Sequence, residues 1–149
     1  MLKNVIKFNK VRNGFKYNSE LEKNMFIEEA REFFDAETLA EQIDAVVDMD
    51  FVRMGTVIKL AYNGINQSEL PYDVAPLDIA IDVVKRELGD NFVVVMGEAE
   101  RIVDEINLTK IAKLDKDGKV MKQKGLRNAT EEIEKFLNEL LESQKPKED

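Results

Sequence analysis

Carboxylates recur at helical spacing in two neighbouring stretches of this 149-residue chain. Glu29 and Glu32 stand three residues apart, and a second set follows at Glu41, Asp44 and Asp48. Residues three, four or seven positions apart share one face of a helix, so each set forms an acidic stripe. Clustered carboxylates repel one another and bind hard divalent cations that neutralise them. The pattern therefore predicts a site for Mg²⁺, with Mn²⁺ as a substitute.

The composition restricts the chemistry further. The chain has no cysteine and no histidine, which excludes disulfides, thiolate or imidazole metal ligands and a Ser-His-Asp triad. The formal net charge of −8 argues against binding a nucleic-acid duplex with the whole surface. No apolar run is long enough to span a membrane, and the basic first 15 residues lack the apolar stretch of a signal peptide. We expect a cytoplasmic protein.

Hydrophobic periodicity and boundary signals predict one mostly α-helical domain over residues 1–143 and a disordered, charged tail at 144–149. The predicted helices cover residues 18–34, 36–62, 77–88, 91–106 and 129–143, with a loop at 63–76 and a small C-terminal β-hairpin at 111–124. Residues 1–15 fit either a strand or a helix. Candidate capping boxes are Ser19 with Glu22 and Thr38 with Glu41.

The first two predicted helices form an antiparallel hairpin because only a few residues join them. With the turn centred near residues 36–37, the register pairs Glu32 with Glu41, Glu29 with Asp44, and Met25 with Asp48. The acids would then face one another within apolar surroundings, where they are costly unless something neutralises them. The alternative is an ordinary solvated acidic face, with Glu41 acting only as a cap of the second helix.

Two short motifs resemble a known family. Residues 28–32 read E-E-A-R-E and match E-E-x-x-E, and residues 41–44 read E-Q-I-D and match E-x-x-D. Together they resemble the all-α nucleoside triphosphate pyrophosphohydrolases of the MazG type, which include the phosphoribosyl-ATP pyrophosphohydrolases. Residues 44–56 look like the second helix of a bacterial and phage branch of that family, and residues 107–110 and 117–120 are similar to its C-terminal half. The resemblance covers about residues 18 to 125.

The resemblance implies a Mg²⁺-dependent enzyme that cleaves a nucleotide between its α- and β-phosphates, giving a monophosphate and pyrophosphate. It implies metal ligands at Glu29, Glu32, Glu41 and Asp44, the set that helical projection also favours. Only eight residues separate Glu32 from Glu41, fewer than is usual in that family. An alternative alignment of the second acidic motif puts Asp48 at its final aspartate and Asp44 at its glutamate. Asp48 is therefore a fifth candidate ligand. Glu29 or Glu32 is the expected general base.

Basic and amide side chains around the predicted β-hairpin are candidates to bind the triphosphate. They are Asn107, Lys110, Lys119, Lys122, Lys124 and Arg127. For Lys119, Lys122 and Lys124 the alternative role is to block pairing at an exposed hairpin edge. Lys110 is better supported because it belongs to the segment that is similar to the family.

The second predicted helix is apolar nearly all round, which indicates contacts on several sides. The family usually forms a four-helix bundle across a dimer interface, so we expect a homodimer or a tetramer that shares such a core. Two other functions stay open: phosphoribosyl-ATP hydrolysis, and a non-catalytic acidic helical module that binds a partner protein. Nucleotide hydrolysis in Mg²⁺ would exclude the second of these.

Overall fold

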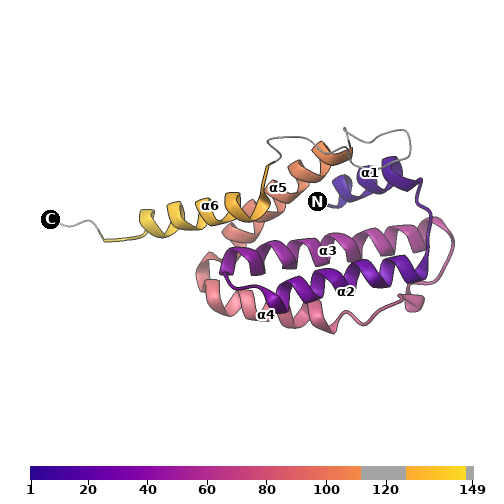
Figure 1. Ribbon diagram of the computed structural model, residues 1–149, viewed down its shortest axis with the longest axis horizontal. Coiled ribbons are helices and arrows are strands. Elements are labelled where there is room, and N and C mark those ends of the chain that lie inside the picture. The colour runs from indigo at the N-terminus through magenta and orange to yellow at the C-terminus, as the bar shows by residue number, and fades with distance from the viewer. Residues whose placement is uncertain (112–126, 147–149) are drawn as a thin grey trace.

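The computed structural model describes residues 1–111 and 127–146. All regular structure in these residues is helical, which confirms the all-α class (Figure 1). The elements are α1 (Leu2–Asn13), α2 (Ser19–Asp35), α3 (Leu39–Tyr62), η1 (Gln67–Glu69), α4 (Ala75–Leu88), η2 (Gly89–Asn91), α5 (Phe92–Ile111) and α6 (Ala129–Ser143). None of the helices in the described ranges has both the length and the apolar character needed to cross a membrane.

Helix α3 is the centre of the molecule. It runs antiparallel beside α2, as the short connection predicts, and it also contacts α1, α4, α5 and α6 (Figure 1). The prediction that an all-round apolar helix has neighbours on several sides is therefore confirmed. Those neighbours belong to the same chain, so the apolar surface of α3 does not by itself require a second subunit.

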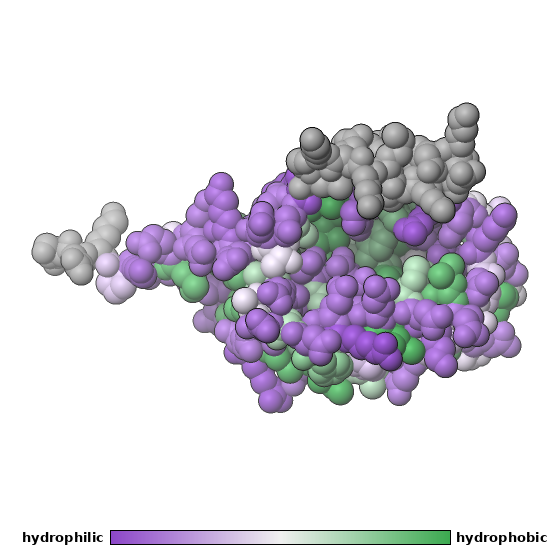
Figure 2. Space-filling view, viewed as in Figure 1, coloured by the Kyte–Doolittle hydropathy of each residue, from purple (hydrophilic) through white to green (hydrophobic). Residues whose placement is uncertain are grey.

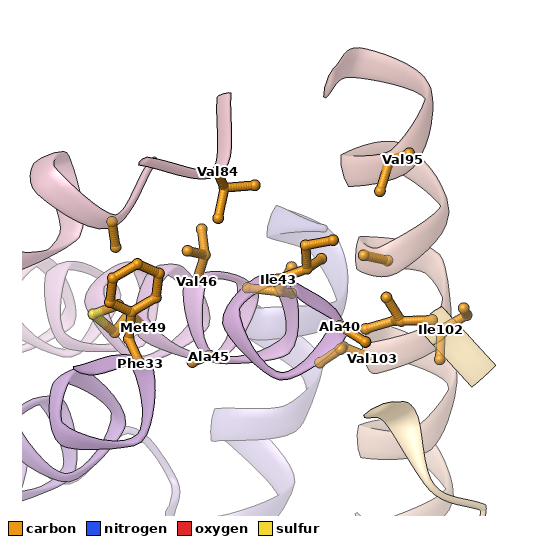
Figure 3. Packing of buried hydrophobic residues seen from close by; sticks show 14 of the residues in the cluster. Phe33, Ala40, Ile43, Ala45, Val46, Met49, Val84, Val95, Ile102 and Val103 are labelled. Atoms are coloured by element: carbon orange, nitrogen blue, oxygen red, sulfur yellow. The ribbon is translucent and has the colours of Figure 1, made fainter. Parts of the chain in front are cut away.

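The main core lies where α3 meets the helices around it. Figure 3 shows Val46 of α3 facing Val84 of α4, and Ala40 of α3 beside Ile102 and Val103 of α5. All five side chains are at most 2% exposed. Burial of this kind stabilises by about 25 cal/mol per Å² of apolar surface, so the core holds α3, and the acids it carries, in one orientation.

The predicted boundaries agree with the structure at the C-terminal end of α4 and at both ends of α6, whereas α4 begins at Ala75, two residues before the predicted start. Pro76 lies in the first turn of α4, and Gly89 ends that helix with a φ of 53°, a value that glycine adopts without strain. Helix α6 spans Ala129–Ser143, as predicted. Its C-terminal end lies beside η2, where Gln144 Nε2 donates to Asn91 Oδ1 at 2.8 Å.

Helix α5 is longer than predicted. It runs from Phe92 to Ile111 rather than over residues 91–106, and its β-branched start is helical. Tertiary packing overrides the strand propensity here, because Val95, Ala99 and Ile102 recur at helical spacing and are buried. The predicted β-hairpin at 111–124 lies outside the described residues, except for Ile111, and so do the final three residues of the predicted tail.

The N-terminal caps of the hairpin helices correct one prediction and confirm another. The box of Ser19 with Glu22 is wrong: the Asn18 side chain caps α2 by accepting from the Leu21 N–H at 3.1 Å. The second helix begins at Leu39 rather than at residue 36, because the chain before it is extended. Thr38 Oγ1 accepts from the Glu41 N–H at 3.2 Å, and Glu41 Oε2 accepts from the Glu37 N–H at 3.1 Å. The capping role of Glu41 is therefore confirmed.

Residues 1–15, which fit a strand or a helix, form helix α1. Val5 and Phe8 are buried against Phe51 of α3, with the two aromatic rings in an edge-to-face contact whose centroids lie 5.2 Å apart. Helix α1 packs on α3 and α5, which places its polar residues above the hairpin that carries the acids.

Candidate metal and nucleotide site

Three carboxylates converge between α2 and α3. Glu29 and Glu32 come from α2 and Asp48 comes from α3, and one oxygen of each lies within 4.8 Å of the others. Oxygens bound to one Mg²⁺ ion at about 2.1 Å lie at most about 4.2 Å apart. Small side-chain rotations would therefore bring these three oxygens onto a single hard cation.

The acids whose side chains meet differ from the predicted pairs. The sequence paired Glu29 with Asp44, but one oxygen of Glu29 lies within 4.8 Å of one of Asp48. Met25 and Asp48, another predicted pair, line one cleft between the helices. In a helix every side chain leans toward the N-terminus of its own helix. In an antiparallel hairpin, α2 side chains therefore lean away from the turn and α3 side chains lean toward it. When the ends of an α2 and an α3 side chain meet, their Cα atoms therefore lie about one helical turn apart along the hairpin axis. This offset favours contact of Glu29 with Asp48 rather than with Asp44.

The remaining predicted acids lie at the edge of this group. Asp44 Oδ2 accepts a hydrogen bond from Thr130 Oγ1 of α6 at 3.1 Å. Burial raises the pKa of Asp44, and the nearby charge of Glu32 raises it further. Glu41 is occupied with the cap of α3 and is not part of the converging three. Among the candidate ligands on α3, Asp48 is the one that joins the converging group.

Burial and like charge make Glu29 and Asp48 costly to ionise. Burial, followed by the negative charges of Asp48 and Glu32, raises the pKa of Glu29 from 4.5 to about 9. The pKa of Asp48 is also raised, first by burial and then by Asp44, while the charge of Lys110 opposes the rise. Glu29 Oε2 is buried and has no hydrogen-bond partner among the described residues. A buried carboxylate oxygen without such a partner is chemically suited to bind a hard cation.

Two clefts meet at the cluster. We call the wider one, of about 820 Å³, the outer cleft; Glu32, Glu41, Asp44 and Thr130 line it together with Arg31. We call the second, of about 350 Å³, the inner cleft; it lies between α1, α2, α3 and α5. Glu29 and Asp48 line the inner cleft, as do Asn107 and Lys110 of α5. The structure therefore places Asn107 and Lys110, two of the candidate triphosphate-binding residues, in the same cleft as Glu29 and Asp48.

The other predicted cations are placed differently. Arg127 donates to Glu132 and Glu105 in two ion pairs of 2.6 and 3.2 Å, which join α5 to the start of α6. These partners raise the pKa of the guanidinium further. Lys119, Lys122 and Lys124 lie outside the described residues.

A buried ion pair beside the inner cleft was missed by the sequence reasoning. Glu22 of α2 and Lys59 of α3 bind each other, and both are at most 3% exposed. Thr56 Oγ1 donates to Glu22 Oε2 at 2.8 Å, and the Tyr72 hydroxyl donates to Thr56 Oγ1 at 2.8 Å. Glu22 was interpreted as a capping residue. The signal that could have identified it is its position one turn before Phe26 on the apolar face of α2.

Polar residues of α1 were also missed. Asn9, Arg12 and Asn13 line the inner cleft, and their spacing puts them on one face of a helix. That signal becomes readable only once residues 1–15 are known to be a helix.

The raised pKa values predict a pH-dependent stability in the absence of metal. Below pH 4.5 Glu29 is protonated in both the folded and the unfolded chain. Between pH 4.5 and about 9 the unfolded chain ionises while the folded one holds its proton, so stability falls as pH rises. Histidine and cysteine, which ordinarily titrate in this range, are absent. We expect the Tm in EDTA to fall steadily from pH 5 to pH 9.

Adding Mg²⁺ should reverse this fall, because the cation replaces the proton on the carboxylates. The Tm increase caused by Mg²⁺ should therefore grow with pH. Differential scanning fluorimetry at fixed ionic strength, with NaCl as the control for screening, measures both effects. A metal-free Tm that stays level from pH 5 to pH 9 would contradict the shifted pKa of Glu29.

Comparison of the chain with protein-family models, with curated proteins and with solved structures finds no match.

Proposed function

We propose that the chain is a Mg²⁺-dependent nucleoside triphosphate pyrophosphohydrolase that cleaves between the α- and β-phosphates. One observation carries the proposal: Glu29 and Glu32 of the E-E-x-x-E helix converge with Asp48 of the next helix at the junction of two clefts. The likeness of these motifs to the MazG-type enzymes supports the same conclusion from the sequence.

The residues of the cluster have separate tasks in this proposal. Asp48, Glu32 and Glu29 would hold the metal, and Asp44 lies at the edge of these three carboxylates. The bound Mg²⁺ would neutralise triphosphate charge and orient a water molecule. Glu29 or Glu32 accepts the proton of that water as its oxygen bonds to the α-phosphorus. The bond from the α-phosphorus to the bridging oxygen breaks, and pyrophosphate leaves.

Lys110 supplies the cation that the triphosphate needs. Its charge acts on both Asp44 and Asp48, and it lines the same cleft as Asp48. An ammonium group in this cleft could bind a phosphate oxygen of the substrate. Asn107, one helical turn earlier on α5, offers an amide to the same ligand.

A panel of ribo- and deoxynucleoside triphosphates, together with phosphoribosyl-ATP, tests the proposal directly. We expect release of pyrophosphate and a monophosphate in Mg²⁺ and none in EDTA. Glu32→Gln should lose most of the activity while its circular dichroism spectrum stays unchanged. Orthophosphate with a diphosphate would show a different cleavage position. No release from any nucleotide would contradict the enzyme proposal and favour a protein-binding module.

The homodimer or tetramer remains part of this proposal. Exposed apolar side chains on the first turn of α5 and on α6, namely Val93, Val94 and Leu141, are 55 to 78% exposed and could be covered by another subunit. Light scattering coupled to size-exclusion chromatography would give the mass in solution. A monomer at the assay concentration that retains full activity would contradict this part of the proposal.

A further inference from the structure

The inner cleft changes character along its length. At one end lie the carboxylates Glu29 and Asp48 with Lys110. Met25, Phe51 and Val52 form apolar walls in the middle. Figure 2 shows hydrophobic surface set between hydrophilic side chains on the face formed by α2 and α3. Such an order suits a ligand that is charged at one end and flat and apolar further along.

Toward Gly55 of α3 the cleft is lined by amides of α1. Asn9 and Asn13 line it, four residues apart and therefore on one face of the helix. Asn9 lies against Gly55 of α3, which is seven residues, or about 10 Å, along the helix from Asp48. This separation is close to the distance from the α-phosphate of a nucleotide to the far edge of its base.

The Asn9 amide has one fixed orientation. It is only 5% exposed, and its Nδ2 donates to the Val5 carbonyl at 2.8 Å. Because a carbonyl accepts and never donates, the nitrogen must face Val5, and Oδ1 faces elsewhere. A Cβ at position 55 would lie 3.0 Å from Asn9 Nδ2, so Gly55 is the residue that allows the amide to sit against α3. No described residue donates a hydrogen bond to Asn9 Oδ1.

Asn13 presents a second acceptor. Its Oδ1 is buried and has no hydrogen-bond partner within residues 1–111 and 127–146. A buried unpaired acceptor costs free energy, and a ligand donor that binds it recovers that cost. The two nearby cations do not serve as its donor: Lys59 binds Glu22, and Arg12 lies over the Phe8 ring, 5.6 Å from its centroid.

We propose that the inner cleft binds the nucleoside part of the substrate, and that Asn9 and Asn13 select a base with an exocyclic amino group. Two carbonyl acceptors in this part of the cleft match the amino group of cytosine or adenine. Uracil and hypoxanthine place a carbonyl oxygen at the same position, where it would face the acceptors and leave them unpaired. This inference rests on the proposed function for the position of the phosphates.

The matched pairs dCTP with dUTP and dATP with dITP test the inference, since each pair differs at the amino position. We expect the full chain to prefer the amino member by kcat/KM. Asn13→Ala should lower the preference by roughly ten-fold, because one donor–acceptor pair is lost. Asn138→Ala, which removes an exposed amide of α6, is the matched control and should leave the preference unchanged. Equal preference in Asn13→Ala and the unaltered chain would overturn the inference.

Two further measurements separate folding and hydrolysis from recognition. Asn13→Ala removes an unpaired buried atom, so its Tm should not fall; Asn9→Ala, which also loses the bond to Val5, is the second variant. Binding of the α,β-methylene analogues of dCTP and dUTP in Mg²⁺ is measured by calorimetry. If the dCTP analogue binds more tightly than the dUTP analogue but none of the four ordinary nucleotides is hydrolysed, the proposed reaction is contradicted and the base assignment is supported. Hydrolysis of all four nucleotides at equal kcat/KM would support the proposed reaction and contradict the base assignment.

Discussion

Replacing Asp48 by asparagine is expected to lower Mg²⁺-dependent pyrophosphate release by about 100-fold or more, and to raise the Tm of the metal-free protein. Loss of a residue that only orients a metal ligand costs about 10- to 100-fold, and Asp48 is one of the three converging carboxylates themselves. The gain in stability follows from the same geometry, because the Asp48 charge raises the pKa of Glu29. A neutral amide relieves that repulsion. Mg²⁺ should then no longer raise the Tm.

Glu41→Gln is the matched control, since it makes the same carboxylate-to-amide change on the same helix. Glutamine can accept the hydrogen bond from the Glu37 N–H that Glu41 accepts now. We expect activity within about three-fold of the unaltered chain. Pyrophosphate release and thermal unfolding are measured for both variants side by side. Full activity in Asp48→Asn would show that the three converging carboxylates are not the active site. Equal losses in both variants would show that Glu41 is a ligand, as the sequence motif implies.

Replacing Lys59 by methionine is expected to lower the free energy of unfolding by about 3–5 kcal/mol. The change leaves Glu22 buried, at 1% exposure, without its counter-charge. Thr56 still donates to Glu22 Oε2, but one neutral hydrogen bond does not replace an ammonium group. Urea unfolding followed by circular dichroism measures the loss.

The double variant Glu22→Leu with Lys59→Met should recover most of that loss, because apolar side chains of similar volume replace a buried ion pair at little cost. Thr56 Oγ1 keeps a second acceptor, the Val52 carbonyl at 3.0 Å. Arg86→Met is the surface control: its pair with Asp82 is exposed, so the change should stay within about 0.5 kcal/mol. A Lys59→Met variant as stable as Arg86→Met would show that the pair contributes nothing, contrary to the burial argument.

The helices themselves were predictable from the sequence because local signals determine them. Pro76 and Gly89 bound α4 through their own backbone preferences, and the apolar periodicity of α6 alone gives its two ends. The acidic stripes on α2 and α3 could be found in the same way, since helical spacing decides which residues share a face. Helix α1 and the length of α5 could not, because their local patterns are compatible with strand or helix and packing on α3 decides between them.

What only the tertiary structure decided is which acids and amides meet. The lean of side chains in an antiparallel hairpin brings Asp48, rather than Glu41, to Glu29 and Glu32. Glu22 and Lys59 are 37 residues apart in sequence and are joined by the packing of α2 on α3. Asn9 reaches the cleft because Gly55 lets α1 approach α3 closely. The sequence alone thus determined the types of chemistry available and the helices that carry them. The contacts depend on how helices pack at distances of a few ångströms, and spacing along one helix does not contain that information.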